Sequence, residues 1–261
     1  MTTFIAIVGA KGGVGKTTTA INLASALTQF SRNTIVVDCH LQKPNVGLYL
    51  GYTHTPKNIT NALKGKHKVS EAIYLHPSGI HVVPADMAID AIKHKFDKDH
   101  IAQTLTDLVY KSEIILVDTP SDFTDMQTIV HACDAVIYLT TPDLVSMTDT
   151  LKAMELLKPQ QKKTLGVVVA KNKGKSYETE LIDIESLLNM PIIGNIPYDD
   201  EISRAQNQKY PVVYANTDAA STIAYKKLAA NLIGEPYEHG KEENESFWSY
   251  LFMRLGLRNP K

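Results

Sequence analysis

The sequence contains little cysteine, no excess of either charge and no long apolar run. Its two cysteines, Cys39 and Cys133, are far apart among 261 residues, which excludes a CxxC ligand pair for zinc or an iron–sulfur cluster within one chain. The formal net charge of -1 excludes a polycation that coats DNA through charge alone. No stretch reaches the roughly 18 apolar residues of a membrane span. We therefore expect a cytoplasmic protein with both thiols buried and reduced.

The N-terminal segment MTTFIAIVGA lacks a positively charged flank, so it predicts a buried strand and not a signal peptide. Further short apolar runs recur along the chain, and their continuous hydrophobicity indicates strands buried on both faces. The runs cover residues 4–8, 34–37, 80–83, 114–117, 135–139, 165–169 and 192–196. Segments with helical period cover 18–30, 100–110, 145–157 and 219–233. This alternation predicts an α/β domain over residues 1–234, with a mostly parallel, doubly wound sheet flanked by helices.

A glycine-rich segment follows the first predicted strand. Residues 10–17, AKGGVGKT, match the pattern GxxxxGK[ST] except that Ala10 replaces its first glycine, and they lie between a buried strand and a helix. In this pattern, backbone N–H groups converge on one point and the helix start adds its positive dipole end. We expect Lys16 to neutralise the β- and γ-phosphates of ATP, and the Thr17 hydroxyl to coordinate Mg²⁺. The residues expected around the phosphates are Gly12, Gly13, Val14, Gly15, Lys16, Thr17 and Thr18.

A second lysine, Lys11, gives the loop the form KGGxGKT. With this motif the chain resembles the MinD/ParA family of dimerising ATPases, which carry a deviant Walker A motif, and in particular its MinD-like branch. The resemblance covers residues 3 to about 235. It implies that Lys11 reaches across a dimer interface to the partner's nucleotide, so that ATP joins two subunits. The alternative is a solvated loop lysine.

The same resemblance implies roles for residues that follow other predicted strands. Asp118, in IILVDTPSD, ends a buried strand as the Walker B carboxylate does, and Asp38, in VVDCHLQKPNVG, matches the first switch segment. Asp149, in TTPDLVSMTDT, falls at the dimer position that contacts the additional lysine. Asn172 and Pro197 lie in the two segments that resemble the adenine-binding ones. The implied catalytic groups are Lys11, Lys16, Asp38 and Asp118, and the implied metal ligands are Thr17, Asp38 and Asp118.

Three positions depart from the family pattern. His40 replaces an aspartate that helps to position the attacking water, so we expect slowed or absent hydrolysis with nucleotide binding retained. Near its reference pKa of about 6.5 this imidazole could even become cationic. Asp122 replaces a glycine of the second switch and is interpreted as an outward-pointing carboxylate. Ala170 replaces the adenine-reading asparagine, for which Asn172 is the nearest substitute.

After Gly234 the helical pattern ends. Residues 235–245, EPYEHGKEENE, form a polar linker, and residues 246–261 are strongly hydrophobic. On a helical wheel these residues form one broad apolar face with two arginines at its edge. This pattern favours a helix on the membrane surface. The alternatives are a helix docked on its own domain and a helix in a partner's groove. The residues expected at the membrane are Phe247, Trp248, Leu251, Phe252, Arg254, Leu255 and Arg258.

The resemblance therefore implies a spatial regulator of the MinD type. ATP and Mg²⁺ would drive homodimerisation, and the dimer would lie peripherally on the inner face of the cell membrane and position unidentified protein partners. A ParA-like DNA-segregation ATPase is the first alternative, but the core domain has no dense basic run, and Lys93, Lys95 and Lys98 form only a modest group. A flagellar-number regulator of the FlhG type is the second.

Overall fold

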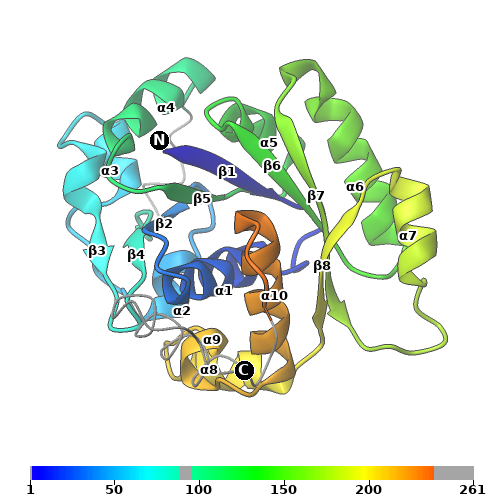
Figure 1. Ribbon diagram of the computed structural model, residues 1–261. Helices are drawn as coiled ribbons and strands as arrows, with labels where there is room; N and C mark the ends of the chain where they lie inside the picture. The colour runs from blue at the N-terminus through cyan, green and yellow to red at the C-terminus, as the bar shows by residue number, and fades with distance from the viewer. Residues whose placement is uncertain (1, 89–95, 238–261) are drawn as a thin grey trace, which may run out of the picture.

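The computed structural model describes residues 2–88 and 96–237, and its described strands form one sheet (Figure 1). The strand order is β3-β4-β2-β5-β1-β6-β7-β8. Neighbouring strands are parallel except for β3, which is antiparallel to β4 at the sheet edge. The bounds are β1 Thr3–Val8, β2 Thr34–Asp38, β3 Tyr74–Leu75, β4 His81–Val83, β5 Ile114–Asp118, β6 Ala135–Thr140, β7 Lys163–Asn172 and β8 Ile192–Pro197.

Helices cover both faces of this sheet, as Figure 1 shows. One layer contains α1 (Lys16–Gln29), α2 (Val46–Leu50), α8 (Asp200–Asn207), α9 (Val212–Ala215) and α10 (Ala220–Ile233). The other contains α3 (Ile59–Leu63), α4 (Lys98–Leu105), α5 (Phe123–Val130), α6 (Leu144–Leu157) and α7 (Leu181–Leu188). Short 3-10 turns span Val69–Ala72, Thr106–Leu108 and Lys158–Gln160.

The alternation of side chains along each strand divides the core into two. In β1, Ala6 and Val8 belong to the cluster under α3–α7, while Ile5 and Ile7 belong to the cluster under α1 and α10. Successive side chains of a strand point to opposite faces, so a continuous apolar run fills both clusters. The predicted doubly wound α/β fold is confirmed.

One predicted helix is shorter in the structure, and one short strand was not predicted. The helix predicted over residues 100–110 begins at Lys98 and ends at Leu105, followed by the 3-10 turn. Tyr110 has a left-handed φ of 65°, and its N–H donates to Thr2 Oγ1 at 2.8 Å, because the chain must turn there to enter β5. The two-residue strand β3 is too short to carry a periodic signal and was not predicted.

The chain leaves the domain beside the C-terminal end of α1. Glu235 accepts a hydrogen bond from Arg32 at 2.6 Å, and the Tyr237 ring lies edge-on to Phe30 with centroids 6.1 Å apart. Most of the predicted linker and the whole predicted membrane segment, residues 246–261, lie outside the described residues, as do Lys93 and Lys95. Within the part that is described, no helix is long and apolar enough to cross a membrane.

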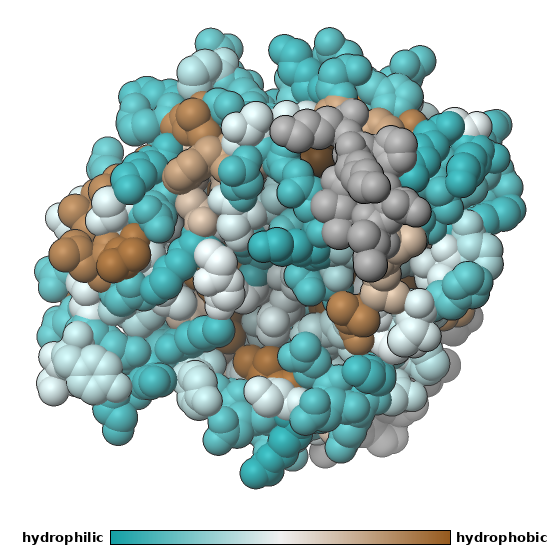
Figure 2. All heavy atoms as spheres, turned by 180° about the vertical axis from the view of Figure 1, so that it is seen from behind, coloured by the Kyte–Doolittle hydropathy of each residue, from teal (hydrophilic) through white to brown (hydrophobic). Residues whose placement is uncertain are grey.

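Seen from behind, the surface is mostly hydrophilic, and its apolar side chains gather in small patches (Figure 2). The clearest patch lies at the left margin, the side on which α7 lies, and α7 exposes Ile182 and Leu187.

Candidate nucleotide-binding site

The glycine-rich loop connects the carboxyl end of β1 to the start of α1. Gly13 and Gly15 have φ angles of 76° and 109°, in the left-handed region that residues with side chains rarely adopt. Gly15 is the N-cap of α1, so the turn leads directly into the helix. The first N–H groups of a helix have no intrahelical partner and, with the helix dipole, favour a bound anion. The loop therefore has the backbone geometry of a phosphate cradle.

Lys16 carries its ammonium group back into this loop. Its Nζ donates to the Gly9 carbonyl at 2.7 Å and to Ser121 Oγ at 2.6 Å, and the residue is only 7% exposed. Burial lowers the pKa of Lys16 to about 8, and the neighbouring Asp118 carboxylate opposes this shift. A buried cation thus lies where the phosphate oxygens are expected.

Asp38 and Asp118 are register partners at the ends of β2 and β5. Thr17 Oγ1 donates to Asp118 Oδ2 at 2.6 Å. The second oxygen, Asp118 Oδ1, is buried and has no hydrogen-bond partner among the described residues. Burial raises the pKa of both carboxyl groups, and for Asp38 the nearby Asp118 adds to the rise.

Asp38 uses its oxygens differently. Its Oδ1 accepts from the His40 N–H at 3.1 Å, and its Oδ2 accepts from the Asn45 and Val46 N–H groups, both at 3.0 Å. These contacts fix the loop after β2. The unpartnered oxygen of Asp118 and the Thr17 hydroxyl are the hard oxygen donors that Mg²⁺ prefers, so the residues present fit the ion. Thr17 and Asp118 would hold it, and Asp38 would act through the loop and through ordered water.

These groups open onto a cavity of about 890 Å³ between the phosphate loop and the loop after β2. The residues that line it include Gly12, Gly13, Gly15 and Thr18 of the phosphate loop and α1, together with Lys171 and Gln206. A bound metal ion would supply charge neutralisation of the phosphates here. The protein itself supplies the backbone N–H groups, the Lys16 ammonium and the carboxylate that orient the triphosphate.

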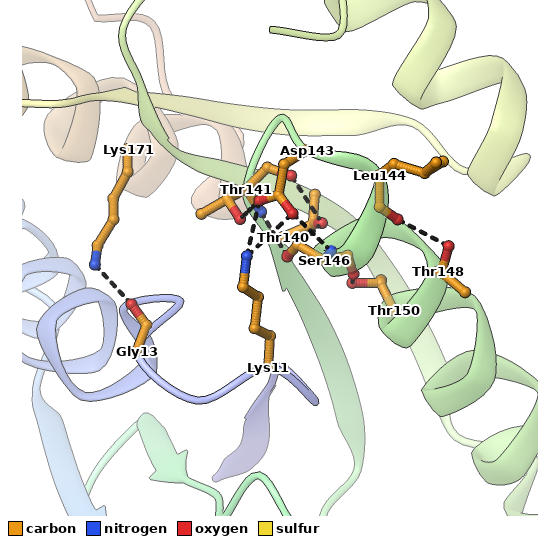
Figure 3. Close-up of polar contacts among 10 residues, drawn as sticks. All are labelled: Lys11, Gly13, Thr140, Thr141, Asp143, Leu144, Ser146, Thr148, Thr150 and Lys171. Atoms are coloured by element: carbon orange, nitrogen blue, oxygen red, sulfur yellow. Dashed lines mark hydrogen bonds and ion pairs between the residues drawn. The ribbon is translucent and has the colours of Figure 1, made fainter.

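Lys11 opens onto a second cavity of about 390 Å³, which Val14 also lines. Its Nζ lies 3.0 Å from both carboxylate oxygens of Asp143 (Figure 3). Asp143 also caps α6 through the Ser146 N–H and accepts from Thr141 Oγ1. Partial burial would raise the pKa of Asp143, but the hydrogen bonds from Thr141, Ser146 and Lys11 hold it below its usual value. The two lysines of the loop therefore face different cavities.

Asp149, the residue predicted to contact Lys11, lies farther along α6. Its Oδ1 pairs with Lys152 Nζ at 3.2 Å. Within one chain the structure brings Lys11 to Asp143 and does not bring it to Asp149. The contact between Lys11 and Asp149 across two subunits stays a prediction.

His40 lines the larger cavity. Burial, followed by the positive charges of Lys16 and Lys43, lowers its pKa to about 4. The expectation that this imidazole becomes cationic is therefore wrong, because both burial and the two lysines disfavour a further positive charge. His40 remains a neutral hydrogen-bonding group at physiological pH.

Asp122 is the N-cap of α5. Its exposed carboxylate accepts from the Thr124 N–H at 2.9 Å and from the Asp125 N–H at 3.2 Å. A carboxylate in this position satisfies free N–H groups and complements the helix dipole. Asp122 also lines the nucleotide cavity, so its interpretation as an outward-pointing residue stays a prediction.

The predicted adenine residues lie beside the site, but their polar groups have other partners. Asn172 Nδ2 donates to Asn195 at 3.0 Å, and its Oδ1 accepts from the Gly174 N–H at 2.8 Å. Pro197 pairs with Asn172 in the sheet. Lys171, one residue earlier, instead reaches the phosphate loop, where its Nζ donates to the Gly13 carbonyl at 2.6 Å.

Sequence reasoning missed Ser121, Asp143 and Lys171. Each contacts the phosphate loop from a segment more than 100 residues away. Ser121 and Asp143 both follow strand-terminal segments that were singled out for other residues. Their position after a strand, at the carboxyl edge of a parallel sheet, is the sequence signal that could have identified them as site residues.

Comparison with known proteins agrees with this geometry. Residues 5–212 match the family described as the CobQ/CobB/MinD/ParA nucleotide binding domain. The chain belongs to this family. An uncharacterized ATP-binding protein of Methanocaldococcus jannaschii is 32% identical over 255 residues, which cover 96% of each chain.

Two solved MinD structures place the chain in the MinD-like branch. The cell division ATPase MinD of Pyrococcus furiosus has a TM-score of 0.85 and 27% identity, over 90% of this chain and 99% of that one. The septum site-determining protein MinD of Pyrococcus horikoshii, complexed with Mg-ADP, has a TM-score of 0.84 and 26% identity, over 89% of this chain and 96% of that one. The family, the phosphate loop and the magnesium-competent carboxylate make ATP with Mg²⁺ the cofactors of this MinD/ParA-type ATPase.

Proposed function

We propose that this chain is a MinD-like spatial regulator whose ATP-bound form is a homodimer attached to the inner face of the cell membrane, where it positions other proteins. The observation that carries the proposal is the division between the two lysines of the phosphate loop. Lys16 is buried in the nucleotide cavity, whereas the Lys11 side chain is 38% exposed in the second cavity. A lysine that bound only its own nucleotide would have no reason to face outward.

The surface around Lys11 supports an interface. Leu144 and Val145, which follow Asp143, are 70% and 63% exposed, and Tyr177 and Tyr198, which line the second cavity, are 75% and 54% exposed. Large exposed apolar side chains that gather around one site mark interaction surfaces. Interface cores are enriched in tyrosine and depleted of charged residues. We call these four residues the Lys11 rim.

ATP would link the two halves of such a dimer. A second copy of the same chain brings its own nucleotide to the rim, and Lys11 would then exchange the Asp143 carboxylate for a phosphate of that nucleotide. A pair as exposed as Lys11 and Asp143 contributes little stability. Breaking this pair therefore costs little free energy, and the attraction of Lys11 to the more highly charged phosphate would exceed that cost.

Membrane attachment rests on residues 246–261, and hydrolysis on the nucleotide cavity. One short interfacial helix binds a membrane about as weakly as a single acyl chain, whereas two joined helices gain avidity. Hydrolysis of ATP to ADP and phosphate would separate the subunits and release the membrane. Because His40 supplies no fixed negative charge, we expect this turnover to be slow.

Sedimentation velocity tests the dimer. With Mg²⁺ and a non-hydrolysable ATP analogue the chain should sediment as a dimer, and with Mg-ADP as a monomer. Lys11→Ala should remain monomeric with the analogue while still binding it, and Lys175→Ala, which removes an equal charge from an exposed position, should dimerise. A native chain that stays monomeric, or a Lys11→Ala dimer, would refute the proposal. A dimer that shifts DNA but ignores vesicles would favour the ParA-like alternative.

A further inference from the structure

Lys171 occupies an irregular position at the end of β7. Val169 pairs with Asn195 of β8 and Asn172 pairs with Pro197, so Ala170 and Lys171 together lie opposite one residue. This is a β-bulge, a feature that turns a side chain away from the direction of the regular strand. Lys171 also has a φ of 57°, in the left-handed region that a non-glycine residue rarely adopts. Such conformations cost free energy, persist where the surrounding structure holds them, and are concentrated at functional sites.

The bulge directs Lys171 toward the phosphate loop. Figure 3 shows its side chain extended from the strand to Gly13, whose carbonyl oxygen lies 2.6 Å from Nζ. Lys171 also lines both the nucleotide cavity and the Lys11 cavity, so it lies where the loop separates them. The strand thus contributes a cation to the backbone of the loop, 158 residues away in sequence.

Peptide geometry gives this contact a consequence. The bond between Gly13 and Val14 is trans, and in a planar trans peptide the carbonyl and the following N–H point in opposite directions. Holding the Gly13 oxygen toward Lys171 therefore directs the Val14 N–H away from Lys171. Gly13 has a φ of 76°. Because it has no side chain, its backbone can adopt other φ and ψ values and so rotate this peptide. Without a partner for the carbonyl, its negative end could turn toward the phosphates.

We propose that Lys171 is a positioning residue of the phosphate loop: it holds the Gly13 carbonyl outward so that the Val14 N–H faces the β-phosphate of a bound nucleotide. The ligand class is a nucleoside diphosphate or triphosphate, and the part that Lys171 acts on is the diphosphate group, not the base. The contact with Gly13 would offset the free-energy cost of the left-handed backbone conformation of Lys171. It does not depend on the dimer.

Lys171→Asn separates this role from a structural one. Asparagine tolerates the left-handed conformation better than lysine, but its side chain is too short to reach Gly13. The melting temperature of the nucleotide-free variant should therefore stay equal or rise, while the Kd for Mg-ADP rises by about tenfold or more, the lower end of the range for a hydrogen bond from a charged donor. The Kd for inorganic pyrophosphate, measured by displacement of a fluorescent ADP analogue, should rise by the same factor.

Two further variants complete the test. Lys171→Arg keeps a cationic donor of similar reach and should restore the Kd for Mg-ADP to within about twofold of the native value. Lys175→Asn, which makes the same change of charge at an exposed position on the same segment, should leave both ligands unaffected. The proposal is overturned if Lys171→Asn lowers the melting temperature along with affinity, if it weakens Mg-ADP but not pyrophosphate, if it changes neither, or if arginine fails to restore binding.

Discussion

Asp38 and Asp118 end neighbouring strands, yet their carboxylate oxygens have different partners. Three backbone N–H groups of the following loop bind Asp38, whereas one oxygen of Asp118 is buried without a partner in the described chain. Both positions could be predicted from sequence, because the carboxyl ends of parallel strands meet at one edge. The difference between them could not, because it depends on the backbone path of residues 39–46.

His40 gives the first prediction at the scale of single residues. The neutral imidazole lies in the nucleotide cavity, where the family pattern has a carboxylate. His40→Asp should accelerate steady-state phosphate release by about tenfold or more, because a fixed negative charge can orient and deprotonate the attacking water. The rate is measured with saturating Mg-ATP.

His40→Asn is the matched control for this prediction, since it has nearly the size of aspartate without its charge. Its rate should stay near that of the native chain. If the aspartate and native chains release phosphate at the same robust rate, the histidine does not limit hydrolysis.

At the scale of elements, the long helices and the buried strands were predictable, whereas several short helices were not. The predicted helix over 145–157 differs from α6 by one residue, because fourteen residues carry several helical periods. In α5 the sequence offers only eight residues, and its start is set by the capping carboxylate of Asp122. From the sequence, Asp122 was interpreted as a departure in a switch segment. Its capping role becomes visible only when the start of α5 is known.

Because Asp122 caps α5, we expect its replacement to change the stability of the fold and not the affinity for nucleotide. Asp122→Ala should lower the free energy of unfolding by about 1 kcal/mol, the usual effect of removing an N-cap, whereas Asp122→Ser should nearly preserve it. The Kd for the Mg-ATP analogue should change by less than about twofold in both variants. Thermal or urea unfolding and a binding titration measure the two effects. Tighter binding by Asp122→Ala would instead show that this carboxylate repels the γ-phosphate.

At the scale of the whole molecule, the site is a product of sheet topology. Strand β1 lies in the centre of the sheet, between β5 and β6, so its phosphate loop meets residues that follow β5 and β6 and a residue near the end of β7. The contiguous motif was readable from sequence because its spacing alone defines it. The contributions of Ser121 and Lys171 required the strand order and the bulge in β7, which local patterns do not encode.

The C-terminal segment gives the last prediction, which concerns the intact chain. If residues 246–261 form an amphipathic helix, Leu251 lies on its apolar face and Ser249 on the opposite face. Leu251→Glu should then abolish flotation with anionic phospholipid vesicles, while Ser249→Glu, which adds the same charge, should retain it. With the non-hydrolysable ATP analogue the native chain should bind vesicles about 10² to 10⁴ times more tightly than with ADP, because the second helix of a dimer inserts at high effective concentration. Equal flotation of the two glutamate variants would rule out the amphipathic helix, and equal flotation of the ATP and ADP forms would rule out coupling to the nucleotide.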